Sequence, residues 1–137
     1  MDGFTGSEGV IVLAATIAAT DGFGSQVLKP WFGRTRPCFA DPEHVRMLAP
    51  IADTGSLPSL HAANSFAVLA VIAFLFPRLA VALAPIAILI SLSRIVVGVH
   101  WLSDVLAGAL YGALVGLTMA LIGRRLRMVH VEARSAV

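Results

Sequence analysis

Long apolar runs separated by short polar segments dominate the hydrophobic pattern of this chain. A helix needs about 20 apolar residues to cross a bilayer, because each residue adds about 1.5 Å. Four runs fit this requirement, and they predict membrane helices at residues 8–29, 58–76, 79–99 and 103–122. The first is the weakest, since its apolar stretch Val10–Thr20 is short and is followed by Asp21, Gly22 and Gly24. The pattern therefore predicts an all-α, integral-membrane helical bundle in a single domain of residues 1–137.

Small residues mark one face of the last expected helix. Gly108, Gly112 and Gly116 are spaced four apart, so a helix places them in one stripe. Such a stripe lets a neighbouring helix approach closely, and it predicts a packing face and not a functional site. The segment 123–137 after this helix is polar, and we expect it to form a frayed cytoplasmic tail.

The composition agrees with a membrane protein. Hydrophobic residues make up 58% of the chain and charged residues 13%, whereas soluble domains have about 45–50% and about 25%. No basic stripe with interleaved aromatic residues occurs, so nucleic-acid binding has no support. Cys38 is the only cysteine, which excludes a disulfide within the chain and a zinc site built from cysteines.

Arginines outside the apolar runs predict the orientation. Three follow the last helix and one lies between the second and third: Arg124, Arg125, Arg127 and Arg78. All four belong to one face, which the positive-inside rule assigns to the cytoplasm. We therefore expect a multi-pass protein of the cytoplasmic (inner or plasma) membrane, with the loop 31–57 and the junction around His100 on the extracytoplasmic face. The cations Lys29, Arg34, Arg36 and Arg46 near that loop oppose the rule, unless some of them bind a ligand.

A polar cluster, Ser93-Arg94-x5-His100-x3-Asp104, joins the third and fourth helices. His100 and Asp104 are four residues apart, so a helical turn places them side by side. A carboxylate beside a histidine fixes its tautomer and stabilises the cation that forms when the ring attacks. Taken alone, the cluster leaves a plainer alternative open, in which Arg94 snorkels to the membrane surface and His100 caps a helix.

Two further clusters fall on the same expected face, namely Lys29-Pro-Trp-Phe-Gly-Arg-Thr-Arg36-Pro37 and Pro58-Ser59-Leu60-His61. Lys29, Arg36 and Arg94 would then gather at one end of a nearly uncharged bundle, which requires an anion between them. A phosphate suits two arginine forks and an ammonium. Ser59 and the first N–H groups of the second helix add an anion site, and His61 can protonate a leaving alkoxide.

Together, the three clusters resemble the signature of the type 2 phosphatidic acid phosphatase family, which includes the vanadium haloperoxidases. The family pattern is Lys-x6-Arg-Pro, Pro-Ser-Gly-His and Ser-Arg-x5-His-x3-Asp, and the chain matches all but one position between Lys29 and Asp104. The resemblance implies that His100 is the nucleophile, oriented by Asp104, and that His61 is the general acid. It implies a phosphate site formed by Lys29, Arg36, Ser59, Leu60 and Arg94. It also implies that no metal or other cofactor takes part.

The function implied by this resemblance is metal-independent hydrolysis of a phosphate or diphosphate ester of a membrane lipid, through a vanadate-sensitive phosphohistidine step. The sequence leaves the lipid open between undecaprenyl diphosphate, phosphatidylglycerol phosphate, phosphatidic acid and lipid A phosphates. A lipid phosphotransferase of the same superfamily and a non-catalytic membrane scaffold are the alternatives. A homo-oligomer is also left open.

Two features depart from the family pattern. Leu60 replaces the glycine of the second motif, where its N–H can still bind phosphate but its side chain narrows the pocket. A leucine here resembles the transferase branch of the superfamily, whereas the complete first motif favours the phosphatase branch. Membrane members usually have six helices, so we expect either a minimal version or a chain whose Met1 is an internal start, with two helices preceding Glu8.

Two polar residues lie beside the motifs. Asn64 follows His61 by one helical turn, where its amide could orient the imidazole. Asp21 interrupts the first apolar run, either as a polar anchor between helices or as a residue that tunes Lys29.

Overall fold

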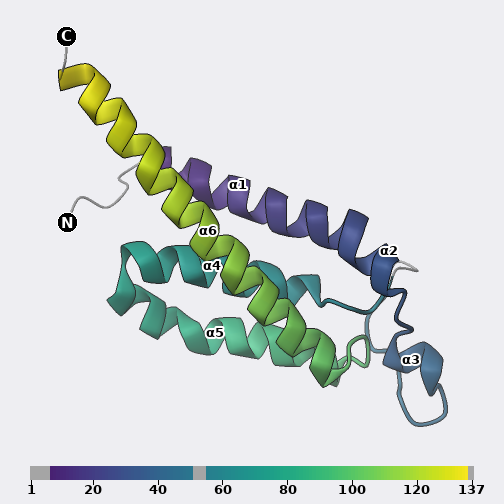
Figure 1. Cartoon of the computed structure of the whole chain (residues 1–137). Coiled ribbons are helices and arrows are strands. Elements are labelled where there is room, and N and C mark those ends of the chain that lie inside the picture. Colours follow the sequence, from purple (N-terminus) through teal and green to yellow (C-terminus); the bar gives the residue numbers. More distant parts are fainter. Residues whose placement is uncertain (1–6, 51–54, 136–137) are drawn as a thin grey trace.

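The computed structural model describes residues 7–50 and 55–135, and within these ranges every regular element is a helix. The elements are α1 (Ser7–Phe23), the π-helical turn η1 (Gly24–Leu28), α2 (Lys29–Phe32), α3 (Pro37–Ala40), α4 (Leu60–Leu75), α5 (Pro77–Val96) and α6 (Leu102–Ser135). Figure 1 shows α6 crossing the other long helices, while α2, α3 and the loop that follows them lie at one end. The predicted all-α bundle is confirmed.

The first helix is longer than its sequence pattern predicts. Helix α1 continues through η1 into α2, where the N–H of Lys29 donates to the carbonyl of Gly24. This π turn lies directly before Lys29, and π turns often occur at functional sites. Gly33 then ends the helix in a left-handed conformation, with φ of 54°, which glycine adopts without steric cost.

The glycine stripe of α6 packs against the backbone of α4. A Cβ atom added at Gly108, Gly112 or Gly116 would lie only 2.4, 1.9 and 2.2 Å from a backbone carbonyl oxygen of α4 or its cap. No side chain larger than a hydrogen fits at such separations. The predicted packing face is therefore confirmed, and it positions α6 against α4.

Gly112→Ala is expected to lower the free energy of unfolding of the bundle by about 3 kcal/mol or more, because the added methyl group would overlap the carbonyl of Ala63. Thermal unfolding in detergent, followed by circular dichroism, measures this effect. Gly22→Ala is the matched control, since a Cβ at Gly22 meets nothing within 4 Å. A Gly112→Ala protein as stable as the Gly22→Ala protein would contradict the close helix contact.

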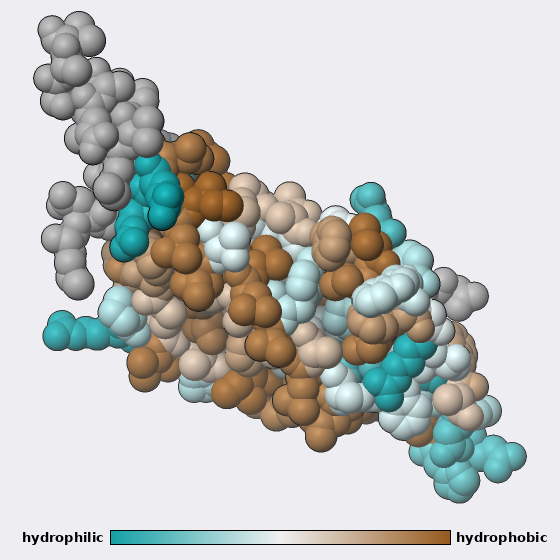
Figure 2. All heavy atoms as spheres, in the orientation of Figure 1, coloured by the Kyte–Doolittle hydropathy of each residue, from teal (hydrophilic) through white to brown (hydrophobic). Residues whose placement is uncertain are grey.

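Most of the long described helices have the length and apolar composition of membrane-spanning helices. Three are long and apolar enough to cross a membrane, at Glu8–Ala40, Pro77–Val96 and Leu102–Leu126. Helix α4 is apolar but has only 16 residues, or about 24 Å at 1.5 Å per residue. Figure 2 shows hydrophobic residues across the middle of the molecule and hydrophilic residues towards its two ends. The chain is therefore a helical membrane protein. The shorter helix α4 begins within the predicted second motif, at Leu60.

The helix bounds correct several sequence predictions. The second and third helices occupy Leu60–Leu75 and Pro77–Val96, where 58–76 and 79–99 were predicted. The prediction of a frayed tail at 123–137 is wrong as far as Ser135, because α6 continues to that residue; residues 136–137 lie outside the described part. Arginine, leucine and methionine favour helix, and the guanidinium of Arg124 lies 5.3 Å from the ring centroid of Phe74 in α4.

Candidate active site

The predicted site residues come together at the end of the bundle where α2, α4, α5 and α6 approach the loops (Figure 1). A cavity of about 420 Å³ opens there, and six of the eight line it: Lys29, Arg36, Leu60, His61, Arg94 and His100. Ser59 and Asp104 are fully buried beside it, and the N–H of Ser59 donates to the backbone oxygen of Asp104 at 3.0 Å. Three segments far apart in the sequence thus form one site.

The imidazole of His100 lies between a carboxylate and a guanidinium. Its Nδ1 is 3.5 Å from Asp104 Oδ2, and its Nε2 is 3.2 Å from Arg36 Nη1. Because a guanidinium can only donate, Nε2 must be the acceptor, and the ring proton belongs on Nδ1, facing Asp104. The separation from Asp104 suits electrostatic stabilisation better than a strong hydrogen bond. His100 therefore presents a basic Nε2 to the cationic side of the site.

The environment keeps His100 neutral. Burial lowers the pKa of His100 below the ordinary histidine value, the Arg36 and Lys29 cations act in the same direction, and Asp104 opposes them. Only the neutral ring has a lone pair on Nε2, so this shift keeps that lone pair at neutral pH.

Asp104 is held by donors that the sequence motifs did not identify. Ser56 Oγ and the N–H of Trp101 donate to Oδ2, the latter at 2.8 Å, and Arg34 Nη1 donates to Oδ1 at 2.9 Å. Arg34 lies inside the first cluster, two residues before Arg36. The family pattern includes no residue at its position, so the sequence did not distinguish Arg34 from the other cations of the loop. Ser56 carries no signal beyond its place in the polar loop. Both residues fix the carboxylate that faces His100.

The turn that carries His100 is attached to the polar loop. Gly98 has φ of 74°, and a Cβ there would lie 2.6 Å from the carbonyl oxygen of Arg46. The N–H of Cys38 donates to the carbonyl of Gly98 at 3.1 Å, and the N–H of Leu48 donates to that of Val97 at 3.1 Å. The end of α5 and the loop are therefore joined by backbone hydrogen bonds, which fix the position of His100.

Several buried polar atoms of the site have no hydrogen-bond partner among the described residues. They include Ser59 Oγ, Arg94 Nε and His100 Nδ1. Leaving a buried polar group unpaired costs about 1–3 kcal/mol. The cations Lys29 and Arg36 are also buried, with 7% and 5% of their surface exposed. A multivalent anion with several acceptor oxygens would satisfy Ser59 Oγ and Arg94 Nε and neutralise the cations, whereas His100 Nδ1 faces Asp104.

Comparison with known proteins identifies the family. A model described as the PAP2 superfamily matches residues 9–128. This chain belongs to the PAP2 superfamily. The resemblance read from the three motifs is thereby confirmed.

Two curated relatives illustrate the similarity. A lipid A 1-phosphatase of Rhizobium johnstonii is 36% identical over 107 residues, covering 76% of this chain and 44% of that protein. A phosphatidylglycerophosphatase B of Bacillus subtilis is 31% identical over 118 residues, covering 78% of this chain and 54% of that protein. The chain therefore spans about half the length of the curated relatives it matches.

A solved structure shares the PAP2 fold with this chain. The crystal structure of a transmembrane PAP2 type phosphatidylglycerolphosphate phosphatase from Bacillus subtilis matches with a TM-score of 0.58 and 26% identity. The match covers 88% of this chain and 67% of that one. The predicted membrane bundle is thus supported by an experimentally determined relative.

Leu60 is the one departure of this PAP2 chain from the motifs, and its side chain packs into a space left by a glycine. A Cβ at Gly24 would lie 2.4 Å from Leu60 Cδ2 and 3.5 Å from Tyr111 Cε1. Leu60 also lines the cavity, as expected for a side chain that narrows the pocket. It is the first residue of α4, and no described residue other than glycine has a positive φ. The backbone at Leu60 therefore does not require glycine.

Asp21 and Asn64 form a contact between α1 and α4. Asn64 Nδ2 donates to Asp21 Oδ1 at 3.2 Å, so Asp21 serves as a polar anchor between the helices. Both residues also line the cavity, together with Lys29. The prediction that Asn64 orients His61 has no support, because the amide N–H points to Asp21 and Asn64 Oδ1 has no partner among the described residues.

Proposed function

We propose that this PAP2 chain removes phosphate from a membrane lipid, with His100 as the nucleophile. The observation that carries the proposal is the pairing of His100 with Asp104 and Arg36, which leaves a neutral ring with a basic Nε2 beside a cationic cavity. The relatives named lipid A 1-phosphatase and phosphatidylglycerophosphatase B support a phosphoric ester hydrolase acting on lipids.

The proposed reaction has two steps. The Arg36 guanidinium transfers its hydrogen bond from His100 Nε2 to a phosphate oxygen. The freed Nε2 lone pair attacks phosphorus and forms a P–N bond, while the P–O bond to the lipid breaks and His61 donates its proton to the departing oxygen. His61 then takes a proton from water, whose oxygen attacks phosphorus and displaces Nε2, releasing inorganic phosphate. Dividing one displacement into two is the usual benefit of covalent catalysis.

The cations and the start of α4 stabilise the transferring group. Lys29, Arg36 and Arg94 surround the cavity and can pair with the equatorial oxygens, where the charge of the transition state is spread. At the α4 N-terminus, the N–H of Ser59 is already bonded to Asp104, so Ser59 offers its hydroxyl and Leu60 its N–H. Asp104 compensates the positive charge that His100 gains on attack.

We propose that the site faces the extracytoplasmic side of the cytoplasmic membrane. Arg78 lies in the turn between α4 and α5, and Arg124 stacks on Phe74 near the same end of α4. The cavity lies at the opposite end, around the start of α4. The positive-inside rule assigns the arginine end to the cytoplasm.

Phosphate release from a panel of lipids tests the proposal. The panel contains undecaprenyl diphosphate, phosphatidylglycerol phosphate, phosphatidic acid and lipid A in detergent micelles. We expect inorganic phosphate from at least one of them, inhibited by vanadate, which adopts the five-coordinate geometry of the transition state. A new phospholipid without free phosphate would indicate a transferase, and no turnover of any lipid would indicate a scaffold; either result contradicts the proposal.

A further inference from the structure

We propose that an apolar groove between α4 and α5 binds one hydrocarbon chain of the lipid whose phosphate occupies the active-site cavity. This inference rests on the proposed function, since it concerns the substrate of the same site. It identifies a subsite that none of the sequence motifs contains.

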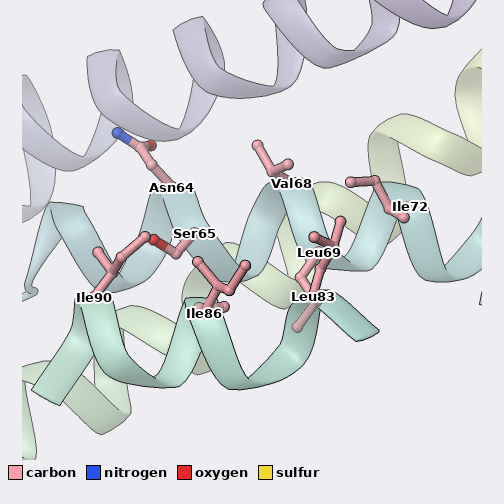
Figure 3. A pocket seen from close by; sticks show the side chains of 9 residues that line it. Asn64, Ser65, Val68, Leu69, Ile72, Leu83, Ile86 and Ile90 are labelled. Atoms are coloured by element: carbon pink, nitrogen blue, oxygen red, sulfur yellow. The ribbon is translucent and has the colours of Figure 1, made fainter. Parts of the chain in front are cut away.

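The groove is formed by facing side chains of two antiparallel helices. It has a volume of about 340 Å³ and is lined from α4 by Val68, Leu69 and Ile72 and from α5 by Leu83 and Ile86, among others. Figure 3 shows Leu69 on α4 and Ile86 and Leu83 on α5 pointing towards one another. Such a lining suits a saturated or unsaturated hydrocarbon chain and offers nothing to a charged group.

The groove is continuous with the proposed phosphate site. Asn64, Ser65 and Ile90 line both the groove and the cavity that contains His100. Along α4, the groove extends from Asn64 to Ile72, a distance of about 12 Å at 1.5 Å per residue. Its two polar residues, Asn64 and Ser65, are both at the end that joins the cavity.

The order of the cationic cavity, the polar junction and the apolar groove matches the chemical structure of a lipid phosphate. The cationic cavity meets the phosphate, the amide and hydroxyl of Asn64 and Ser65 meet the linking oxygens, and the apolar groove meets the chain. A chain held in this groove would fix the direction from which the phosphate approaches His100. Binding energy from a part of the substrate that does not react can thus serve to position the phosphorus.

Continuity with the cavity favours a chain of the substrate over a protein segment. The end of the groove at Asn64, Ser65 and Ile90 opens into the cavity that contains His100. A hydrocarbon chain attached to a phosphate in that cavity enters the groove directly, whereas a helix of a second copy has no such attachment.

A pair of tryptophan variants on α5 tests the groove. Ile86 lines it and is 53% exposed, so a larger side chain can be accommodated while it fills the groove. Ile88 is 47% exposed, is not among the lining residues, and provides the matched control. Phosphate release is measured for wild type, Ile86→Trp and Ile88→Trp with dioleoyl and dibutanoyl phosphatidic acid, which have the same headgroup.

We expect Ile86→Trp to lower kcat/KM for the dioleoyl substrate at least tenfold, and at least five times more than for the dibutanoyl substrate. Ile88→Trp should change neither value more than twofold. Equal losses with both substrates, equal losses in both variants, or a loss that accompanies a changed oligomeric state would overturn the groove as a chain subsite.

A second measurement does not depend on turnover. Phosphatidic acid with a photoactivatable group in its chain is crosslinked to His100→Ala protein with and without Ile86→Trp. Labelling of α4 and α5 peptides that Ile86→Trp removes would support the groove even if the wild type released no phosphate, a result that contradicts the proposed function alone. Labelling confined to other helices would overturn the groove even if the enzyme proves active.

Discussion

His100→Ala is expected to reduce phosphate release by at least about 10⁴-fold, since covalent catalysis loses its nucleophile and His61 is needed for proton transfer. The neutral His100 ring accepts from Arg36 through Nε2, and its loss leaves Arg36 still bonded to the carbonyl of Val99 at 2.9 Å. The helices should therefore remain folded. Phosphate release in detergent micelles measures the rate, and circular dichroism measures the fold.

His44→Ala is the matched control for this variant. His44 lies in the polar loop with 78% of its side chain exposed, and its ion-pair partner among the described residues is Asp41, at 2.8 Å. It should keep wild-type activity. An acid-labile phosphoenzyme should form from ³²P-labelled lipid in the His44→Ala protein and not in the His100→Ala protein. Unchanged activity in folded His100→Ala protein would refute the assignment of the nucleophile.

Asp104→Asn is expected to lower kcat about 10³- to 10⁴-fold, by analogy with the loss of the orienting carboxylate in serine proteases. The side chain of Asp104 is fully buried, and its carboxylate accepts from Ser56, Trp101 and Arg34. An amide cannot accept through both of its ends, so at least one donor loses its partner. The amide also lacks the charge that stabilises His100 as a cation after attack.

The same variant should shift the acid limb of the pH–rate profile to lower pH. Asp104 raises the pKa of His100 against the stronger lowering effect of burial and the cations, so its neutralisation lowers that pKa further. The ring then stays neutral to lower pH, and activity falls only under more acidic conditions. In the wild type, the limb should already lie below about 6.5, the ordinary histidine value.

The dependence of kcat/KM on pH reports ionisations of the free enzyme and measures this shift. Asp41→Asn provides the control, because Asp41 is partly exposed and, among the described residues, forms its ion pair with His44 and not with His100. It should leave the limb in place. A limb that moves to higher pH in Asp104→Asn would show that the titrating group is not a histidine stabilised by Asp104.

The sequence alone predicted the membrane bundle and eight candidate site residues, six of which line one cavity in the structure. Apolar length predicts membrane helices because the bilayer thickness is fixed. Motif spacing predicts side chains that meet within one turn, as it did for His100 and Asp104. The glycine stripe predicted the face of α6 that meets α4, because only a missing side chain permits a close backbone approach.

Helix ends were less well determined. The sequence pattern did not reveal the π turn that joins α1 to α2, nor the continuation of α6 to Ser135. A polar segment with good helix propensity is taken for an irregular tail when the prediction follows hydrophobicity alone. The contact of Arg124 with Phe74 depends on how α6 packs against α4, which the sequence pattern does not give.

Only the tertiary structure decided which atoms meet across distant segments. It placed Arg36 on Nε2 of His100, which assigns the tautomer, and it brought Arg34 and Ser56 to Asp104 from 70 and 48 residues away. It also packed Leu60 against Gly24. Local spacing fixes neighbours within one helix, but the rotation and separation of packed helices arise from all their contacts together. The groove between α4 and α5 results from that packing, and therefore no sequence motif predicts it.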